Sequence, residues 1–132
     1  MIVIGLTLAL GCAGPGVETG DPAAPKPTLA ADLQPIFDRN CTGTCHSGEA
    51  PASGLVLSPG AAYANLVGVA SVQVPSLVRV EPGDPDASYL VAKLEDTHVA
   101  VGGSGTRMPP YLRLADNELL LFRDWIVSGA AE

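Results

Sequence analysis

Apolar residues recur at helical spacing early in the chain, at Leu29, Leu33, Ile36 and Phe37. Thr28 stands immediately before this stripe and is a suitable N-cap, because its hydroxyl can accept a hydrogen bond from the first turn. Pro35 lies within the stripe and has no backbone N–H to donate. The pattern therefore predicts a helix that kinks or starts late and leads directly into Cys41.

The clearest amphipathic pattern lies close to the C-terminus. One apolar stripe consists of Leu119, Phe122 and Ile126, and a neighbouring stripe consists of Leu121 and Trp125. Asp116 is a suitable cap at the start of this helix, and Gly129 a suitable end. Because the first and last predicted helices both carry an apolar face, we expect them to pack against each other.

Two shorter helices are expected between these. The first begins at Ser58, and its inward-facing residues are Tyr63, Leu66 and Val67. The second covers about 84–94, where Asp-Pro precedes an apolar pattern. The Val-rich segment 68–83 is compatible with extended pieces or short strands, and the Gly- and Pro-rich segment 95–113 predicts a loop.

Length and composition set limits on this plan. The chain of 132 residues contains 15 Gly and 12 Pro, which favours one all-α domain with three to five short helices and long loops. A domain of this size buries only about two-thirds of its unfolded surface, so a buried cofactor would help it fold. The net charge of -7 argues against binding of nucleic acid.

The first residues are typical of an export signal. Residues 2–10 form an apolar run too short to span a bilayer. The run ends in Ala9-Leu10-Gly11-Cys12, which resembles a bacterial lipobox and implies lipidation of Cys12. We therefore divide the chain into a signal peptide at 1–12, a flexible Gly/Pro-rich tether at 13–27 and a folded domain at 28–132. The expected location is the periplasm or an outer-membrane-anchored lipoprotein, and a cleaved signal with an incidental cysteine remains the alternative.

The segment Cys41-Thr42-Gly43-Thr44-Cys45-His46 carries the candidate chemistry. Covalent attachment of a c-type haem requires two thiols for the vinyl groups and an adjacent imidazole for iron, usually as Cys-x-x-Cys-His. This chain has one extra residue between the cysteines. Positions three and four apart share a helix face, and Gly43 can form a local loop. The pattern thus predicts thioethers at Cys41 and Cys45 with His46 as the proximal iron ligand.

Met108 is the candidate for the distal iron ligand. It is the only methionine besides Met1, and it lies in a loop immediately before Pro109 and Pro110. A His/Met pair is a common axial set in c-type haem. The alternatives are that Met108 fills a gap in the core, or that His98 is the distal ligand. We expect His98 to lie at the surface.

Three other interpretations of the motif remain open. Cys41 and Cys45 may pair as a disulfide in a surface lipoprotein that acts as a binding module without haem. The same cysteines with His46 and His98 would make a zinc site, although adjacent Cys45 and His46 suit it poorly. A Cys/His nucleophilic enzyme is the third. Three arginines are candidates for pairing with haem propionates or are solvated charges: Arg79, Arg107 and Arg113.

From about Leu33 to Ala130 the chain resembles the small c-type cytochrome domains of exported bacterial proteins, found in planctomycetes and myxobacteria. The matching pieces, in order, are Leu-Gln-Pro-Ile-Phe at 33–37, the Cys-His motif, 54–58, 63–67, 79–85, 88–94, 102–110 and 118–130. The resemblance implies a class I-like cytochrome c fold around one covalent haem c. It also implies that Cys41 and Cys45 hold the haem and that His46 and Met108 bind its iron. The expected function is electron transfer with redox partner proteins, as a carrier or as the haem subunit of a larger oxidoreductase, and not as an enzyme by itself.

The lipobox-like segment generates one prediction. Replacing Cys12 with serine removes the thiol that would carry the lipid, and two acyl chains are enough to hold a protein firmly to a membrane. We expect Cys12→Ser to move the protein from the membrane fraction to the soluble fraction while its absorption spectrum is unchanged. Equal membrane retention of the wild type and the variant, measured by immunoblotting of fractions, would show that Cys12 is not an anchor.

Overall fold

The computed structural model describes residues 24–132. The predicted signal peptide at 1–12, the lipidation site Cys12 and most of the tether at 13–27 lie outside the described residues. Over the described part the elements are helices and isolated bridges, with no β-strand, so the prediction of an all-α domain is confirmed. The α-helices are α1 (Gln34–Phe37), α2 (Ala62–Leu66), α3 (Tyr89–Leu94) and α4 (Asp116–Val127). Within the same residues no helix combines the length and apolarity needed to cross a bilayer.

The first helical segment includes wide turns on both sides of α1. A π-type turn at Leu29–Leu33 precedes α1 and another at Asp38–Thr42 follows it. The Thr28 hydroxyl accepts a hydrogen bond from the backbone N–H of Ala31 at 3.2 Å, which confirms the predicted cap. The N–H of Gln34 donates to the carbonyl of Leu29, five residues earlier. The wide turn thus accommodates Pro35 without ending the helical run.

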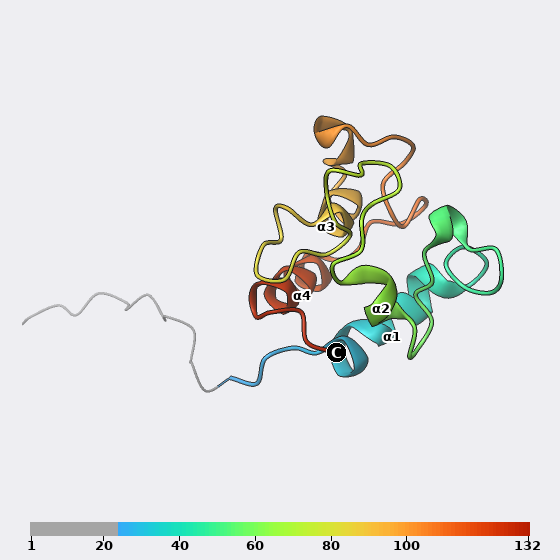
Figure 1. The fold of residues 1–132 in the computed structure, drawn as a ribbon. Helices are drawn as coiled ribbons and strands as arrows, with labels where there is room; N and C mark the ends of the chain where they lie inside the picture. The colour runs from blue at the N-terminus through green and yellow to red at the C-terminus, as the bar shows by residue number, and fades with distance from the viewer. Residues whose placement is uncertain (1–23) are drawn as a thin grey trace, which may run out of the picture.

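The first helical segment packs against α4, as its apolar stripe predicts. The rings of Phe37 and Phe122 are fully buried, with centroids 5.4 Å apart. The backbone N–H of Leu29 donates to the carbonyl of Ala131 at 2.9 Å, and Figure 1 shows the C-terminus beside the start of this segment. Trp125 is buried in the same core. Both ends of the described chain are therefore joined to one hydrophobic core.

The middle helices begin later than their patterns predict. The Ser58 carbonyl accepts hydrogen bonds from the N–H groups of Ala61 and Ala62, so a turn occupies the expected first turn of α2. Before α3, the Asp84 carboxylate accepts hydrogen bonds from the next N–H groups along the chain, at residues 86 and 87. Such turns compete with helix for the same backbone donors.

The connecting segments are irregular. The Val-rich segment 68–83 forms isolated bridges, among them Val67 with Val80 and Ala70 with Val78, and not the short strands considered above. The predicted loop at 95–113 contains one 3₁₀ turn, at His98–Val101. Long loops therefore cover much of the core, and several candidate site residues lie on them.

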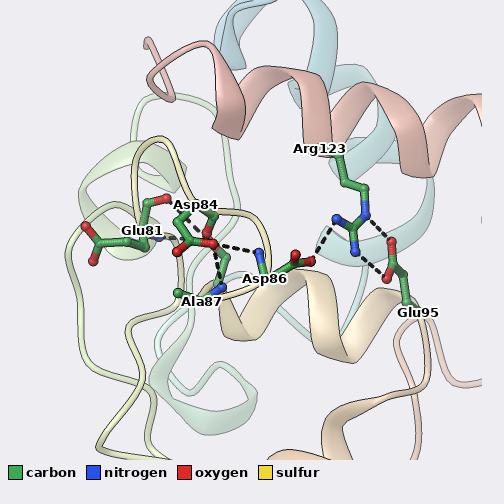
Figure 2. A network of polar contacts seen from close by, with 7 residues as sticks. Glu81, Asp84, Asp86, Ala87, Glu95 and Arg123 are labelled. Atoms are coloured by element: carbon green, nitrogen blue, oxygen red, sulfur yellow. Dashed lines mark hydrogen bonds and ion pairs between the residues drawn. The ribbon is translucent and has the colours of Figure 1, made fainter.

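A charged network connects α3 to α4. Figure 2 shows Arg123 of α4 pointing toward Asp86 and Glu95, which lie before and after α3. The guanidinium donates to both oxygens of Glu95, at 2.6 and 2.8 Å, and to Asp86 at 3.0 Å. These hydrogen bonds lower the pKa of the Glu95 carboxyl, and the same bonds raise the pKa of Arg123. The two-point contact fixes the position of α3 relative to α4.

Replacing Arg123 with glutamine should lower the free energy of unfolding by about 1 kcal/mol at pH 7. The pKa of Glu95 is lower in the folded protein than its ordinary value of 4.5. The contribution of the Arg123–Glu95 contact to stability is therefore fully present at pH values above 4.5. It is lost as the pH falls through the lower pKa that Glu95 has in the folded protein. Urea unfolding at pH 7 and at pH 3 should show a difference between wild type and variant that shrinks in acid.

Arg113→Gln is the matched control, because the Arg113–Asp116 pair is largely exposed, at 52% and 82%. We expect its effect on unfolding to be close to zero at both pH values. An equal loss for the two variants, or no acid dependence for Arg123→Gln, would contradict the role given to the network.

Candidate functional site

A cavity of about 100 Å³, partly open to solvent, lies beside the core; we call it the central cavity. Its apolar wall consists of Phe37, Leu55, Leu57, Leu66, Leu90 and Leu94. These residues come from α1, α2, α3 and the loop before α2. An apolar wall with a few polar groups is typical of cofactor and small-ligand sites.

His46 lines the central cavity and is held in a fixed orientation. Its Nδ1 lies 3.2 Å from the carbonyl oxygen of Leu55, which can only accept a hydrogen bond. Nδ1 must therefore carry the hydrogen in the neutral ring, which leaves a lone pair on Nε2. Burial lowers the pKa of His46, and the charge of Arg79 lowers it further. Both effects favour the neutral imidazole, which is the form that binds metal.

The two cysteines differ in their exposure and in the cavities that they line. Cys41 is half-buried and lines the central cavity, whereas Cys45 is exposed and does not. Cys45 lines an adjoining groove with Cys41, Pro109, Pro110 and Tyr111; we call it the motif groove. The backbone N–H of His46 donates to the carbonyl of Cys41 at 3.1 Å. This hydrogen bond closes a wide turn, which accommodates the extra residue between the two cysteines. Cys41 thus lines both the central cavity and the motif groove, whereas Cys45 lines the motif groove alone.

Met108 reaches the central cavity from the loop before α4. Its backbone N–H donates to the carbonyl of Lys93, in α3, at 2.9 Å. The fold thus brings Met108 and His46, which are far apart in the sequence, to the wall of one cavity. An imidazole and a thioether are borderline and soft ligands that suit iron in haem, and the Cys41 thiol lies in the same wall.

His98 is buried, with only 1% of its surface exposed, so the expectation that it lies at the surface is wrong. Its Nε2 lies 3.0 Å from the carbonyl oxygen of Gly105, and its side chain is not part of the cavity wall. In residues 24–132, no three His, Cys, Asp or Glu side chains gather closely enough to hold one metal ion. The fold therefore does not bring His98 together with Cys41, Cys45 and His46.

Arg79 and Lys93 give the central cavity a positive wall. Arg79 donates to the carbonyls of Asn65 and Ser53, at 2.8 and 3.0 Å, and Lys93 donates only to loop carbonyls. Neither cation forms an ion pair with a carboxylate of the described chain. Burial lowers the pKa of both side chains, which would be offset by an anionic ligand.

The sequence patterns did not point to Lys93. Its only signal is its position four residues after Tyr89, which places both on one face of α3. Of the other two arginines considered for anions, Arg113 pairs with Asp116 at the surface, and Arg107 is absent from the cavity wall.

A comparison of the chain with family models, with curated proteins and with solved structures finds no match. The chemistry of the site is therefore inferred from its own residues. It combines an apolar cavity, a neutral imidazole with a free Nε2 lone pair, a thioether, a thiol in the wall and two cations. An imidazole and a thioether beside two cations form a donor set that is chemically suited to an anionic group containing a metal ion.

The different surroundings of the two thiols should appear in their reactivity. Burial, with a smaller effect of Cys45, raises the pKa of Cys41 from 9.0 to about 11. At a given pH below 9, the Cys41 thiolate is then about a hundredfold less abundant than it would be at a pKa of 9.0. A thiolate of higher pKa is also more nucleophilic, which offsets about tenfold of this loss in reaction rate. In haem-free Cys12→Ser protein at pH 8, iodoacetamide should therefore alkylate Cys41 at least about tenfold more slowly than Cys45, as followed by peptide mass spectrometry.

Unfolding in urea is the control, because it should make the two alkylation rates nearly equal. Equal rates in the folded protein would mean that Cys41 is not enclosed by the cavity wall.

Proposed function

We propose that this protein is a monohaem c-type cytochrome that transfers electrons in the bacterial cell envelope. The observation that carries the proposal is that His46, Met108 and Cys41 line one apolar cavity. These are the residue types of the proximal ligand, the distal ligand and a thioether bond. Their presence in one cavity supports the assignment independently of the motif spacing.

The two candidate iron ligands and the two cysteines each have a role in this proposal. His46 binds the iron through Nε2, because its Nδ1 is engaged by Leu55. Met108 binds from the distal loop, and its soft sulfur favours the ferrous state. Cys41 supplies one thioether, and Cys45, in the adjoining motif groove, supplies the second. Haem c, when bound, supplies an iron that accepts and releases one electron.

The rest of the cavity provides electrostatic and solvent control. The leucine wall limits the access of water, which would protect the iron ligands and favour outer-sphere transfer. Arg79 and Lys93 are suited to the two propionates, since both lack a carboxylate partner in the described chain. With His46 and Met108 both bound to the iron, no open iron position would remain for a substrate, and the protein would act as a carrier. Its partners are redox proteins, and Cys12 would attach it to the membrane.

Production with c-type maturation machinery tests the proposal directly. The haem should survive denaturation and acidic organic extraction, and Cys41→Ala and Cys45→Ala should each leave at most one thioether. Wild-type ferric protein should show the weak far-red band of thioether ligation. Met108→Ala should abolish this band and open the site to carbon monoxide or cyanide, whereas Met108→His should stay six-coordinate with a lower potential.

Haem that extracts completely, or that never binds, would refute a c-type cytochrome. If haem binds but Met108→Ala leaves the spectrum and potential unchanged, then Met108 is not the distal ligand. Loss of six-coordination in His98→Ala instead would assign that role to His98.

A further inference from the structure

Three consecutive carbonyls of the loop that carries Met108 accept hydrogen bonds from two buried side chains. Lys93 Nζ donates to the carbonyls of Ser104, at 3.1 Å, and of Thr106. His98 Nε2 contacts the carbonyl of Gly105 at 3.0 Å. Lys93 is 9% exposed and His98 is 1% exposed. The loop is therefore bound from beneath by side-chain donors, two residues before Met108.

The same two residues also hold the loop through their backbones. The N–H of Met108 donates to the carbonyl of Lys93 at 2.9 Å, and the N–H of Gly103 donates to the carbonyl of His98 at 2.8 Å. A Cβ atom at Gly103 would lie 2.2 Å from Tyr89 Oη and 2.8 Å from the His98 carbonyl oxygen. The loop thus lies directly on α3 and on the following turn, with no room for a side chain at Gly103.

The surroundings of His98 indicate that a contribution to stability does not by itself explain why a histidine is buried at this position. The Gly105 carbonyl can only accept, so Nε2 carries the hydrogen of this bond. Nδ1 is buried and has no hydrogen-bond partner in the described chain, and Asp96 Oδ1 lies 3.9 Å away. A buried polar atom without a partner is destabilising. The one hydrogen bond formed by the imidazole is directed at the loop.

We propose that His98 is a positioning residue that keeps Met108 in the central cavity by holding the Gly105 carbonyl. This inference rests on the proposed function, because it concerns the loop that presents the distal ligand. His98 is a cleaner probe than Lys93, since Lys93 lines the cavity and His98 does not. With the loop held, the thioether stays at its position in the ferric state and external ligands enter slowly.

Three variants of the haem-loaded, full-length protein separate positioning from packing. His98→Gln can place its amide nitrogen near the position of Nε2 and donate to Gly105. His98→Asn has the same amide, but it reaches only the position of Nδ1. His98→Leu fills a similar volume with no donor. The measurements are the strength of the far-red band and the rate at which imidazole binds to the ferric protein.

We expect His98→Leu and His98→Asn to bind imidazole about tenfold faster than the wild type and to weaken the far-red band, as loss of one buried hydrogen bond would cause. His98→Gln should stay within about threefold of the wild type. Met108→Ala gives the upper limit, because no thioether has to leave. A residue that only fills space would give a normal band and rate in His98→Leu.

Gly103→Ala tests the same contact from the loop side and remains informative if His98→Leu does not fold. Besides the clash with Tyr89, the new Cβ atom would lie 2.8 Å from the backbone carbonyl oxygen of His98, which cannot turn aside as a side chain can. The loop must therefore shift, and this variant should also bind imidazole faster. Wild-type rates in both Gly103→Ala and His98→Asn would overturn the inference while leaving the cytochrome intact. A wild-type protein with no haem would instead overturn the proposed function. A wild-type protein with haem but no far-red band would overturn the assignment of Met108 and, with it, this inference.

Discussion

The contact between Phe37 and Phe122 is the interaction on which the rest of the structure depends. It joins the first helical segment to α4, and the nearby hydrogen bond from Leu29 to Ala131 closes the described chain on itself. The other helices are short, and short helices gain most of their stability from tertiary packing. Phe37 also lines the central cavity, so the hydrophobic core and the cavity wall are one continuous surface. Loss of this contact would disturb both.

A second constraint comes from the polar groups around the cavity, which must be satisfied away from water. His46, Lys93 and His98 use backbone carbonyls of irregular segments as partners, and Arg79 uses carbonyls of α2 and of the 3₁₀ turn Ala52–Gly54. Regular helix and sheet consume their own carbonyls, whereas loops offer theirs to side chains. The long loops are therefore part of the site's construction. Because the partners are neutral, the two cations keep their charge available for an anion, and the imidazoles have fixed tautomers.

The parts of the fold that were predictable follow from local rules. The stripe of Leu119, Phe122 and Ile126 and the cap at Thr28 depend on residues within a few positions of each other, and the structure has both. The apolar pattern predicts starts of α2 and α3 that are too early. The reason is that hydrogen bonds at Ser58 and Asp84 favour turns at the positions where the pattern suggests helix. The Val-rich segment 68–83 has strand-like composition but no neighbouring strand within residues 24–132 with which to form a regular ladder.

The sequence by itself determined the helical class of the domain and the residue types of the site: two cysteines next to a histidine, and one methionine in a proline-rich loop. Only the tertiary structure decided that His46, Met108 and Cys41 line one cavity, that Cys45 faces the adjoining groove, and that His98 and Lys93 are buried beneath the distal loop. The physical reason is the range of the interactions. Helix periodicity and capping act over a few residues, whereas burial and cavity walls depend on segments distant in the chain.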